Sequence, residues 1–445
     1  MKEENGNPDA VKEEIFEKVK AYFSLVHGNG KEDHFVPGKS RVPYAGRVFD
    51  EKEMLLLTDS ALEFWLTHGK YSRRFEKEFA SFLGVKNAYL VNSGSSANLL
   101  AFSALTSPLL GERRIRRGDE VITVACSFPT TVAPVIQFGA VPVFVDVEKR
   151  TANIDCSRLE NALSCRTKAV MIAHTLGNPF HVEKVKNFCD EHGLFLIEDN
   201  CDALGSTYDG KLTGTFGDIG TSSFYPPHHM TMGEGGAVYT DDPLLAKILL
   251  SLRDWGRECS CPSGVDNSCG HRFTGQFGSL PAGYDHKYVY SHFGYNLKAT
   301  DMQAAIGCAQ LEKLPFFIRK RQENFAFLHE KLKDLPGVAF LEKYEKSSPS
   351  WFGFLLIVED TQRLDRNALA RHLEGNGIQT RNLFAGNLVR HPCFTLLEEG
   401  KDYRIAGDLT QTDKLMRDAL WIGVYPGMTE AKLRFMAEKI REYVL

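Results

Sequence analysis

The sequence has no hydrophobic run that approaches the length of a membrane span, so no transmembrane helix is expected. Its first twenty residues, MKEENGNPDAVKEEIFEKVK, are highly charged and lack the apolar core of a secretory signal peptide. The net charge of −4 provides no large positive surface for nucleic acid, so any nucleotide partner should be small. These absences predict a cytoplasmic protein that acts on neither membranes nor nucleic acid.

Internal repeats and low-complexity tracts are also absent, which favours ordinary globular domains. The 445 residues are too many for one small domain and predict two or three. The hydrophobic and charged fractions, 43% and 25%, are typical of globular proteins. Ten cysteines in a chain without a signal peptide indicate free thiols or a metal site rather than a disulfide framework.

Apolar periodicity predicts the secondary structure. Residues 10–26 form a leading amphipathic helix, and residues 51–66 and 72–83 form two more. Further along, short apolar runs alternate with helical segments such as residues 182–192, which predicts an α/β fold. The apolar runs lack polar alternation, as expected for strands of a mostly parallel sheet covered on both faces; they are residues 121–124, 141–145, 169–173 and 194–197.

The C-terminal third has a different pattern. Long helices are predicted at residues 299–311 and 315–332, and they lead out of the α/β region. A strand at residues 351–358 and helices near Asp365 and Thr429 predict a smaller α+β domain. We therefore expect an N-terminal helix and arm, a large domain and a small C-terminal domain, at residues 1–48, 49–312 and 313–445.

The strongest functional signal is the stretch Thr221-Ser-Ser-Phe-Tyr-Pro-Pro-His-His-Met-Thr-Met-Gly-Glu-Gly-Gly236. It resembles the motif Ser-Phe-x-x-x-Lys-x-x-x-x-Gly-Glu-Gly-Gly of the DegT/DnrJ/EryC1/StrS sugar aminotransferases, which use pyridoxal phosphate (PLP) on nucleotide-linked keto-sugars. The resemblance extends from about Phe49 to the C-terminus. It implies the type I, aspartate aminotransferase-like fold, with a large PLP-binding domain built on a mostly parallel sheet.

The lysine of that motif, which holds the cofactor as a Schiff base, is replaced here by His228. A Schiff-base lysine anchors the cofactor and moves protons at its reactive carbon. Histidine can move protons near neutral pH but forms no stable imine. We therefore expect a non-covalent cofactor, pyridoxamine phosphate (PMP) or PLP, with His228 as the catalytic base. The neighbouring His229 is a rival for that role, and an inactive relative with a structural histidine is the alternative.

Other parts of the sequence also suit a cofactor site. Asn92–Asn98 is a turn of small residues that opens a helix, and helix N-termini bind phosphate. Asp199 follows a strand, where open α/β sheets bind their ligands. The resemblance implies that Asp199 faces the pyridine nitrogen and that Phe128 stacks on the ring. It also implies phosphate contacts from Gly94, Ser95, Ser96 and Ser223.

Gly294-Tyr-Asn-Leu-Lys298 resembles a family motif whose asparagine reaches the cofactor phosphate of a neighbouring subunit. The resemblance assigns that role to Asn296 and implies a homodimer.

Three cysteines lie in an irregular loop at residues 257–290. Cys259 and Cys261 are separated by one residue, and Cys269 follows. Fe–S clusters are usually held by four cysteine thiolates, and the expected fourth is Cys201, two residues after Asp199. Zinc is an alternative, although its structural sites usually have two to four spacer residues between cysteines. A loop with incidental thiols is the other alternative.

His228 together with these four cysteines resembles one branch of the family, the PMP- and [2Fe–2S]-dependent 3-dehydrases that act on CDP-4-keto-6-deoxy-D-glucose. The resemblance implies removal of the C3 hydroxyl in 3,6-dideoxyhexose and O-antigen lipopolysaccharide biosynthesis. Electrons would reach the cluster from a partner reductase, an iron–sulfur flavoprotein. Asp202 and Tyr225 are candidates for assisting departure of the hydroxyl, and Arg381 and His391 are candidates for contacts with the nucleotide or sugar.

Other functions remain open at this stage. A cluster-containing 3-dehydratase of dTDP-4-keto-2,6-dideoxyglucose from antibiotic pathways would carry the same motifs. A PMP dehydratase without a cluster would also replace lysine by histidine, but the four cysteines disfavour it. A non-catalytic binding protein on the aminotransferase scaffold is the third alternative, because a fold alone does not determine function.

Overall fold

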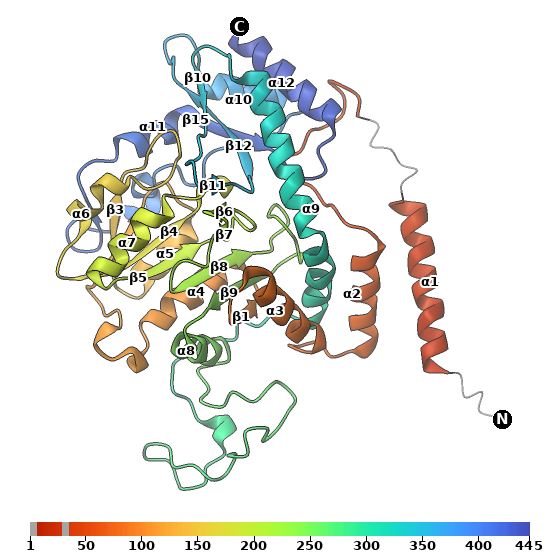
Figure 1. Cartoon of the computed structure of the whole chain (residues 1–445), viewed down its shortest axis with the longest axis vertical. Coiled ribbons are helices and arrows are strands. Elements are labelled where there is room, and N and C mark those ends of the chain that lie inside the picture. Colours follow the sequence, from red (N-terminus) through yellow and green to blue (C-terminus); the bar gives the residue numbers. More distant parts are fainter. Residues whose placement is uncertain (1–6, 29–34) are drawn as a thin grey trace.

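The computed structural model describes residues 7–28 and 35–445 of the chain. Residues 1–6 and 29–34, part of the predicted N-terminal arm, lie outside the described residues. A large β-sheet forms the centre of the molecule (Figure 1). It has eight strands in the order β1-β9-β8-β5-β4-β2-β3-β14. Its strands are β1 (Asn87–Val91), β2 (Glu120–Val124), β3 (Val141–Val145), β4 (Thr167–Ala173), β5 (Phe195–Asp199), β8 (Ile219–Ser223), β9 (Gly236–Thr240) and β14 (Arg404–Ile405).

The sheet is mostly parallel, as the sequence predicts. The pairs from β8 through β5, β4, β2 and β3 to β14 are parallel, whereas β9 runs antiparallel to both β8 and β1. Every residue of β2, β3, β5, β8 and β9 is buried, which explains why these segments have no polar alternation. The four predicted strands are confirmed to within two residues.

Helices cover the sheet on both faces and continue at its β1 edge. They include α2 (Glu51–Glu63), α3 (Lys70–Leu83), α4 (Gly94–Leu105), α5 (Pro129–Gln137), α6 (Leu159–Ala162), α7 (Val182–His192) and α8 (Pro243–Arg253). The leading helix α1 (Pro8–Val26) has no buried residue and packs beside α2. No helix in the described part of the chain is long and apolar enough to cross a membrane.

One long helix, α9 (Asp301–Leu332), replaces the two that the sequence predicts. Pro315 lies inside it instead of ending the first segment, so that prediction is wrong. A proline in a helix interior costs about 3 kcal/mol, but Leu311, Leu314 and Phe317 are buried on both sides of it. Leu311 and Leu314 share a hydrophobic cluster with side chains of α2 and α3, and burial of these residues offsets the lost backbone hydrogen bond. The expected domain boundary at residues 312–313 falls within this helix.

The C-terminal part contains a four-stranded antiparallel sheet in the order β10-β12-β15-β13. Its strands are β10 (Val338–Phe340), β12 (Gly353–Val358), β15 (Ala419–Gly423) and β13 (Thr380–Arg381). The helices beside it are α10 (Arg366–Gly375), α11 (Thr410–Asp418) and α12 (Glu430–Val444). A small third sheet joins β11 (Ser347–Ser348), β6 (Thr207–Tyr208) and β7 (Lys211–Leu212).

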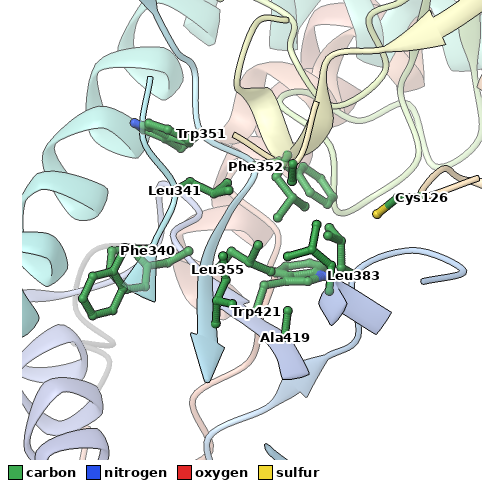
Figure 2. Close-up of a cluster of buried hydrophobic side chains, with 14 of the residues drawn as sticks. Cys126, Phe340, Leu341, Trp351, Phe352, Leu355, Leu383, Ala419 and Trp421 are labelled. Carbon is green, nitrogen blue, oxygen red and sulfur yellow. The ribbon is translucent and has the colours of Figure 1, made fainter. Parts of the chain in front are cut away.

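A shared hydrophobic core connects the four-stranded C-terminal sheet to the eight-stranded sheet. Figure 2 shows part of it, where Trp421 and Leu383 lie close to Leu355 and Ala419. The ring centroids of Phe352 and Trp421 are 5.3 Å apart. The same core includes side chains of the large sheet, and β14 pairs directly with β3. This continuity holds the residues around β12 and β13 against the edge of the large sheet where β5 and β8 end.

Candidate functional site

A cavity of about 660 Å³ opens where β5 and β8 end. Asp199 is the last residue of β5 and Ser223 the last residue of β8, and both line it. The carboxyl ends of parallel strands are where open α/β sheets bind ligands. The lining includes most of the predicted site residues: Gly94, Ser95, Phe128, Asp199, Cys201, Asp202, Ser223, Tyr225, His228, Arg381 and His391.

One wall of the cavity is the N-terminus of α4. Ser93 is its N-cap residue and accepts a hydrogen bond from the Ser96 amide at 3.0 Å. A Cβ atom at Gly94 would lie 2.4 Å from Ser223 Cβ, so only glycine fits between the helix and β8. The free amides and the helix dipole at this end favour an anion such as a phosphate.

Two predicted phosphate contacts differ in their placement. Ser95 lines the cavity together with Ser93, which the sequence did not single out. Within the chain that the structure describes, Ser96 is outside the lining, and its amide is engaged by the N-cap. The N-cap pattern at Ser93 was the signal that could have revealed this difference.

The Asp199 carboxylate is held by three donors. Asn98 Nδ2 and Thr131 Oγ1 each donate to Oδ2 at 2.7 Å, and the Cys201 amide donates to Oδ1 at 3.1 Å. Thr221 Oγ1 donates to Asn98 Oδ1 at 2.7 Å, which fixes the orientation of the Asn98 amide. These hydrogen bonds fix the orientation of the Asp199 carboxyl group at the wall of the cavity.

Sequence reasoning missed Asn98, Thr131 and Thr221. They lie on α4, α5 and β8 respectively, and all three are buried. Nothing in their local sequence indicates a shared partner, because the contact forms only when two helices pack over the ends of two strands.

His228 lies in the turn between β8 and β9 and lines the cavity. Its backbone amide donates to Tyr225 O at 2.9 Å, and Arg321 Nη2 on α9 donates to His228 O at 3.1 Å. Burial, together with the Arg321 guanidinium, lowers the pKa of His228 to about 4. The imidazole is therefore unprotonated near neutral pH and can accept a proton.

The neighbouring His229 has a different environment. It is buried, and its Nε2 donates to the backbone oxygen of Ser350 at 2.7 Å. Within the described residues, His229 does not line the cavity. Of the two adjacent histidines, His228 is thus the one that faces the site.

Asp202 faces the imidazole of His228. Its Oδ1 lies 3.4 Å from His228 Nδ1, and its Oδ2 has no hydrogen-bond partner among the described residues. Burial, with the nearby Asp199 carboxylate, raises the pKa of Asp202 well above its ordinary value. A carboxylic acid in this position can donate a proton. Tyr225 also lines the cavity and is half exposed.

The other end of the cavity is formed by the C-terminal sheet and the N-terminal arm. Tyr44, Asn382, Phe384 and Trp421 line it beside Arg381 and His391. The Arg381 guanidinium lies 4.0 Å from the centroid of the Tyr44 ring. His391 Nε2 donates to the backbone oxygen of Ala385 at 2.6 Å. Aromatic rings and a cation at this end suit a bulky, negatively charged part of a ligand.

Asn296 is exposed, and within the described chain it is outside the lining of this cavity. It forms an antiparallel bridge with Asp254 at the base of the cysteine-containing loop.

The four predicted metal ligands occupy two places. Cys259, Cys261 and Cys269 line one small cavity in the loop between α8 and α9. A hydrogen bond from Ser268 and neighbouring sulfur atoms lower the pKa of Cys261 to about 7. Cys201 instead lies in the large cavity, where its Sγ would be 3.1 Å from a Cβ atom at Gly94. No group of three or more metal-binding side chains within residues 7–28 and 35–445 has the arrangement of a metal site.

Comparison with known proteins identifies relatives over nearly the whole chain. A sequence profile of the DegT/DnrJ/EryC1/StrS aminotransferase family matches residues 48–441. Lipopolysaccharide biosynthesis protein RfbH of Salmonella typhimurium (strain LT2) is 53% identical over 410 residues, 92% of this chain and 93% of RfbH. The dTDP-4-dehydro-2,6-dideoxy-D-glucose 3-dehydratase of Saccharopolyspora spinosa is 51% identical over 437 residues, 98% of this chain and 93% of that protein.

Solved structures agree with these relatives. The E. coli GDP-4-keto-6-deoxy-D-mannose-3-dehydratase with bound hydrated PLP superposes with a TM-score of 0.81 and 30% identity, covering 89% of this chain and 98% of that one. The predicted fold of PLP-dependent aminotransferases, with its mostly parallel central sheet, is confirmed.

Proposed function

This chain belongs to the DegT/DnrJ/EryC1/StrS aminotransferase family, and we propose that within it the protein is a sugar 3-dehydratase of deoxysugar biosynthesis. One observation carries the proposal: a histidine, His228, lines the cavity beside Asp199 at the position of the family's lysine. The similarity to a dTDP-sugar 3-dehydratase over 98% of the chain supports it. The proposed substrate is CDP-4-keto-6-deoxy-D-glucose, and the proposed process is 3,6-dideoxyhexose synthesis for lipopolysaccharide, in the cytoplasm.

The residues of the cavity fit a PMP or PLP cofactor. The N-terminus of α4 and Ser223 enclose a space for phosphate in which a Cβ atom at Gly94 would clash. Asp199 has three donors that hold its carboxyl group in the position suited to face a pyridine nitrogen. Phe128, half exposed at the N-terminus of α5, provides an aromatic face for the ring. PMP would supply the amine that condenses with the C4 ketone and a ring that accepts the electron pair released at the neighbouring carbon.

Each protein group then has a defined task. With PMP bound, His228 would serve as the base at the cofactor's methylene carbon, because its imidazole is neutral and lines the cavity. Asp202 donates a proton to the departing C3 hydroxyl, which leaves as water. Arg381 and the aromatic rings near Tyr44 bind the nucleotide end of the substrate. Replacement of the hydroxyl by hydrogen consumes two electrons and two protons in all.

The electrons are proposed to come from a reductase through a [2Fe–2S] cluster held by Cys201, Cys259, Cys261 and Cys269. Three of these thiols already border one small cavity, which supports their role as a set. The thiolates would hold the cluster, and its iron would supply electrons one at a time. A homodimer is proposed as well, because Asn296, to which the family resemblance assigns a contact with the neighbouring subunit's cofactor, is exposed and outside the lining of its own chain's cavity.

The cofactor content of the purified protein tests this proposal. Anaerobic absorption spectra with iron and sulfide analysis should show PLP or PMP together with an iron–sulfur centre. Gel filtration should remove the pyridoxal cofactor without reduction, and borohydride should leave no pyridoxyl adduct on residues 221–236. A covalent adduct in that segment, or protein that binds no pyridoxal cofactor, would contradict the proposal.

A second candidate is dehydration of dTDP-4-keto-2,6-dideoxyglucose. The identity to the Saccharopolyspora spinosa enzyme is 51%, close to the 53% identity to RfbH, and this similarity supports the second candidate. Turnover of the two nucleotide sugars, compared at equal concentrations, separates the candidates.

A further inference from the structure

The four cysteines do not converge within one chain. Cys259, Cys261 and Cys269 lie on the loop between α8 and α9, which extends away from the large sheet beyond α8 (Figure 1). Cys201 follows β5 and faces the large cavity. A cluster with four thiolate ligands therefore lacks one ligand at the loop and three at the cavity.

The loop and Asn296 form one structural unit. Asp254 and Asn296 form an antiparallel bridge, and Arg257 and Tyr290 form another. The Trp255 amide donates to the backbone oxygen of Tyr295 at 2.6 Å. A partner that contacts Asn296 must therefore lie next to the base of this loop.

The base of the loop also exposes aromatic side chains. Phe293 is fully exposed at 103% of its reference area, and Trp255, Tyr288 and Tyr290 are 41%, 54% and 53% exposed. Exposed aromatic groups at this density are typical of surfaces that a protein partner covers. On the cavity side, Phe128 and Tyr225 are 52% and 48% exposed.

We infer that each iron–sulfur centre forms between two copies of this chain, with Cys259, Cys261 and Cys269 from one copy and Cys201 from the other. The inference rests on the proposed function, which includes the cluster and the homodimer. A symmetric dimer with an isologous interface provides two such sets of four thiolates, so no ligand is left over.

The cross-subunit arrangement has two consequences for the cavity. The partner's loop would cover the open side of the cavity, where Phe128 and Tyr225 are exposed. The centre would also lie beside the cofactor, because Cys201 Sγ is next to Gly94 and Ser223 at the phosphate end of the cavity.

His286 provides the alternative ligand. It lines the same small cavity as the three thiols, and both of its ring nitrogens are buried without a hydrogen-bond partner among the described residues. A centre with three thiolates and His286 would be complete within one loop. Such a centre would leave Cys201 without a role as a ligand.

Mixed dimers separate the cross-subunit arrangement from one in which a single chain supplies all four thiolates. The Cys201→Ser dimer separates the cross-subunit arrangement from the one with His286. Chains with Cys201→Ser and chains with Cys259→Ser are co-expressed with different affinity tags, and the dimers that carry both tags are isolated. In the cross-subunit arrangement, one of the two sites has all four thiolates, because the intact loop of the first chain meets the intact Cys201 of the second. We expect about half of the wild-type iron and sulfide per dimer, with the wild-type electron paramagnetic resonance signal after reduction. Each variant alone should contain neither.

Matched controls make the result specific. Mixed dimers of Cys259→Ser and Cys261→Ser have no complete site in either arrangement and should lack iron, and Cys201→Ala repeats the test with a different side chain. Mixed Cys201→Ser and Cys259→Ser dimers that bind PMP but lack iron would overturn the inference and leave the cluster proposal intact. Full iron in the Cys201→Ser dimer would also overturn it and assign the fourth ligand to His286. A wild-type protein without iron, or one that is monomeric, would overturn the inference together with that part of the proposed function.

Discussion

His228 lies in the cavity wall with an imidazole that burial keeps unprotonated. Its position is set by its own turn, through the hydrogen bond to Tyr225 O, and by Arg321 from α9. The imidazole can therefore exchange protons with a bound cofactor but cannot anchor it covalently. This combination favours removal of a hydroxyl group over transfer of an amino group.

The His228→Asn variant should keep its pyridoxal cofactor and lose proton transfer. We expect substrate-dependent exchange of the PMP methylene hydrogen with solvent to fall by about 10²–10⁴-fold, the usual loss when a general base is removed. The exchange is measured by mass spectrometry of PMP in deuterated water. His229→Asn is the matched control and should retain the exchange, since its ring contacts Ser350 instead of the cavity. Loss of exchange only in the His229 variant would reassign the base.

The pH dependence of the same exchange reports the protonation of His228. A histidine with a lowered pKa loses its proton at lower pH, so a ring with a pKa of about 4 remains a free base throughout the neutral range. The rate should change little between about pH 8 and about pH 6, whereas a histidine with an ordinary pKa near 6.5 would lose about fourfold. A fourfold decrease, with PMP binding unchanged over this range, would show that the bound cofactor restores an ordinary pKa.

The sequence predicted the site residues that stand in recognisable motifs. His228 and Asp199 stand in motifs, and the structure places both in one cavity. Asn98 and Thr131 could not be found in the same way, because they act only through Asp199 across the ends of separate elements. Asp202 was predicted as a candidate acid, but its approach to His228 Nδ1 depends on the path of the turn after β8.

The strands and most helices follow from apolar periodicity, because burial on both faces leaves a clear pattern. Helix α9 does not, since Pro315 suggests an end that tertiary packing overrides. The arrangement of the cysteine loop could not be predicted either, because its short irregular segments carry no periodicity. It contains one short 3₁₀ helix, η4 (His286–Tyr288).

Pro315 offers a direct test of that packing argument. Its side chain is exposed, so Pro315→Ala restores a backbone donor in α9 without removing buried contacts. We expect the free energy of unfolding to rise by about 1–3 kcal/mol, and thermal unfolding of the holoprotein should move upward by several degrees. Arg319→Ala, at a nearby exposed position, should change stability by no more than about 0.5 kcal/mol. An unchanged or lower unfolding temperature for Pro315→Ala would mean that the helix requires the proline geometry.

At the scale of the whole molecule, the two sheets share one core, and the cavity lies where they meet. The proposed cofactor end is formed by strands β5 and β8 with helix α4, and the proposed substrate end by residues around β13 and the N-terminal arm. Such a site holds a cofactor rigidly at one end and leaves room for a large substrate at the other.

The product formed from a nucleotide-linked 4-keto-6-deoxyhexose is the strongest test of the proposed dehydration. The protein is incubated anaerobically with PMP, CDP-4-keto-6-deoxy-D-glucose and a one-electron reductant, and the sugar is analysed by mass spectrometry. The proposed function predicts a sugar that has exchanged its C3 hydroxyl for hydrogen, with no amino sugar. Accumulation of a 4-amino sugar, with conversion of PMP to PLP, would show an aminotransferase and contradict the proposed function.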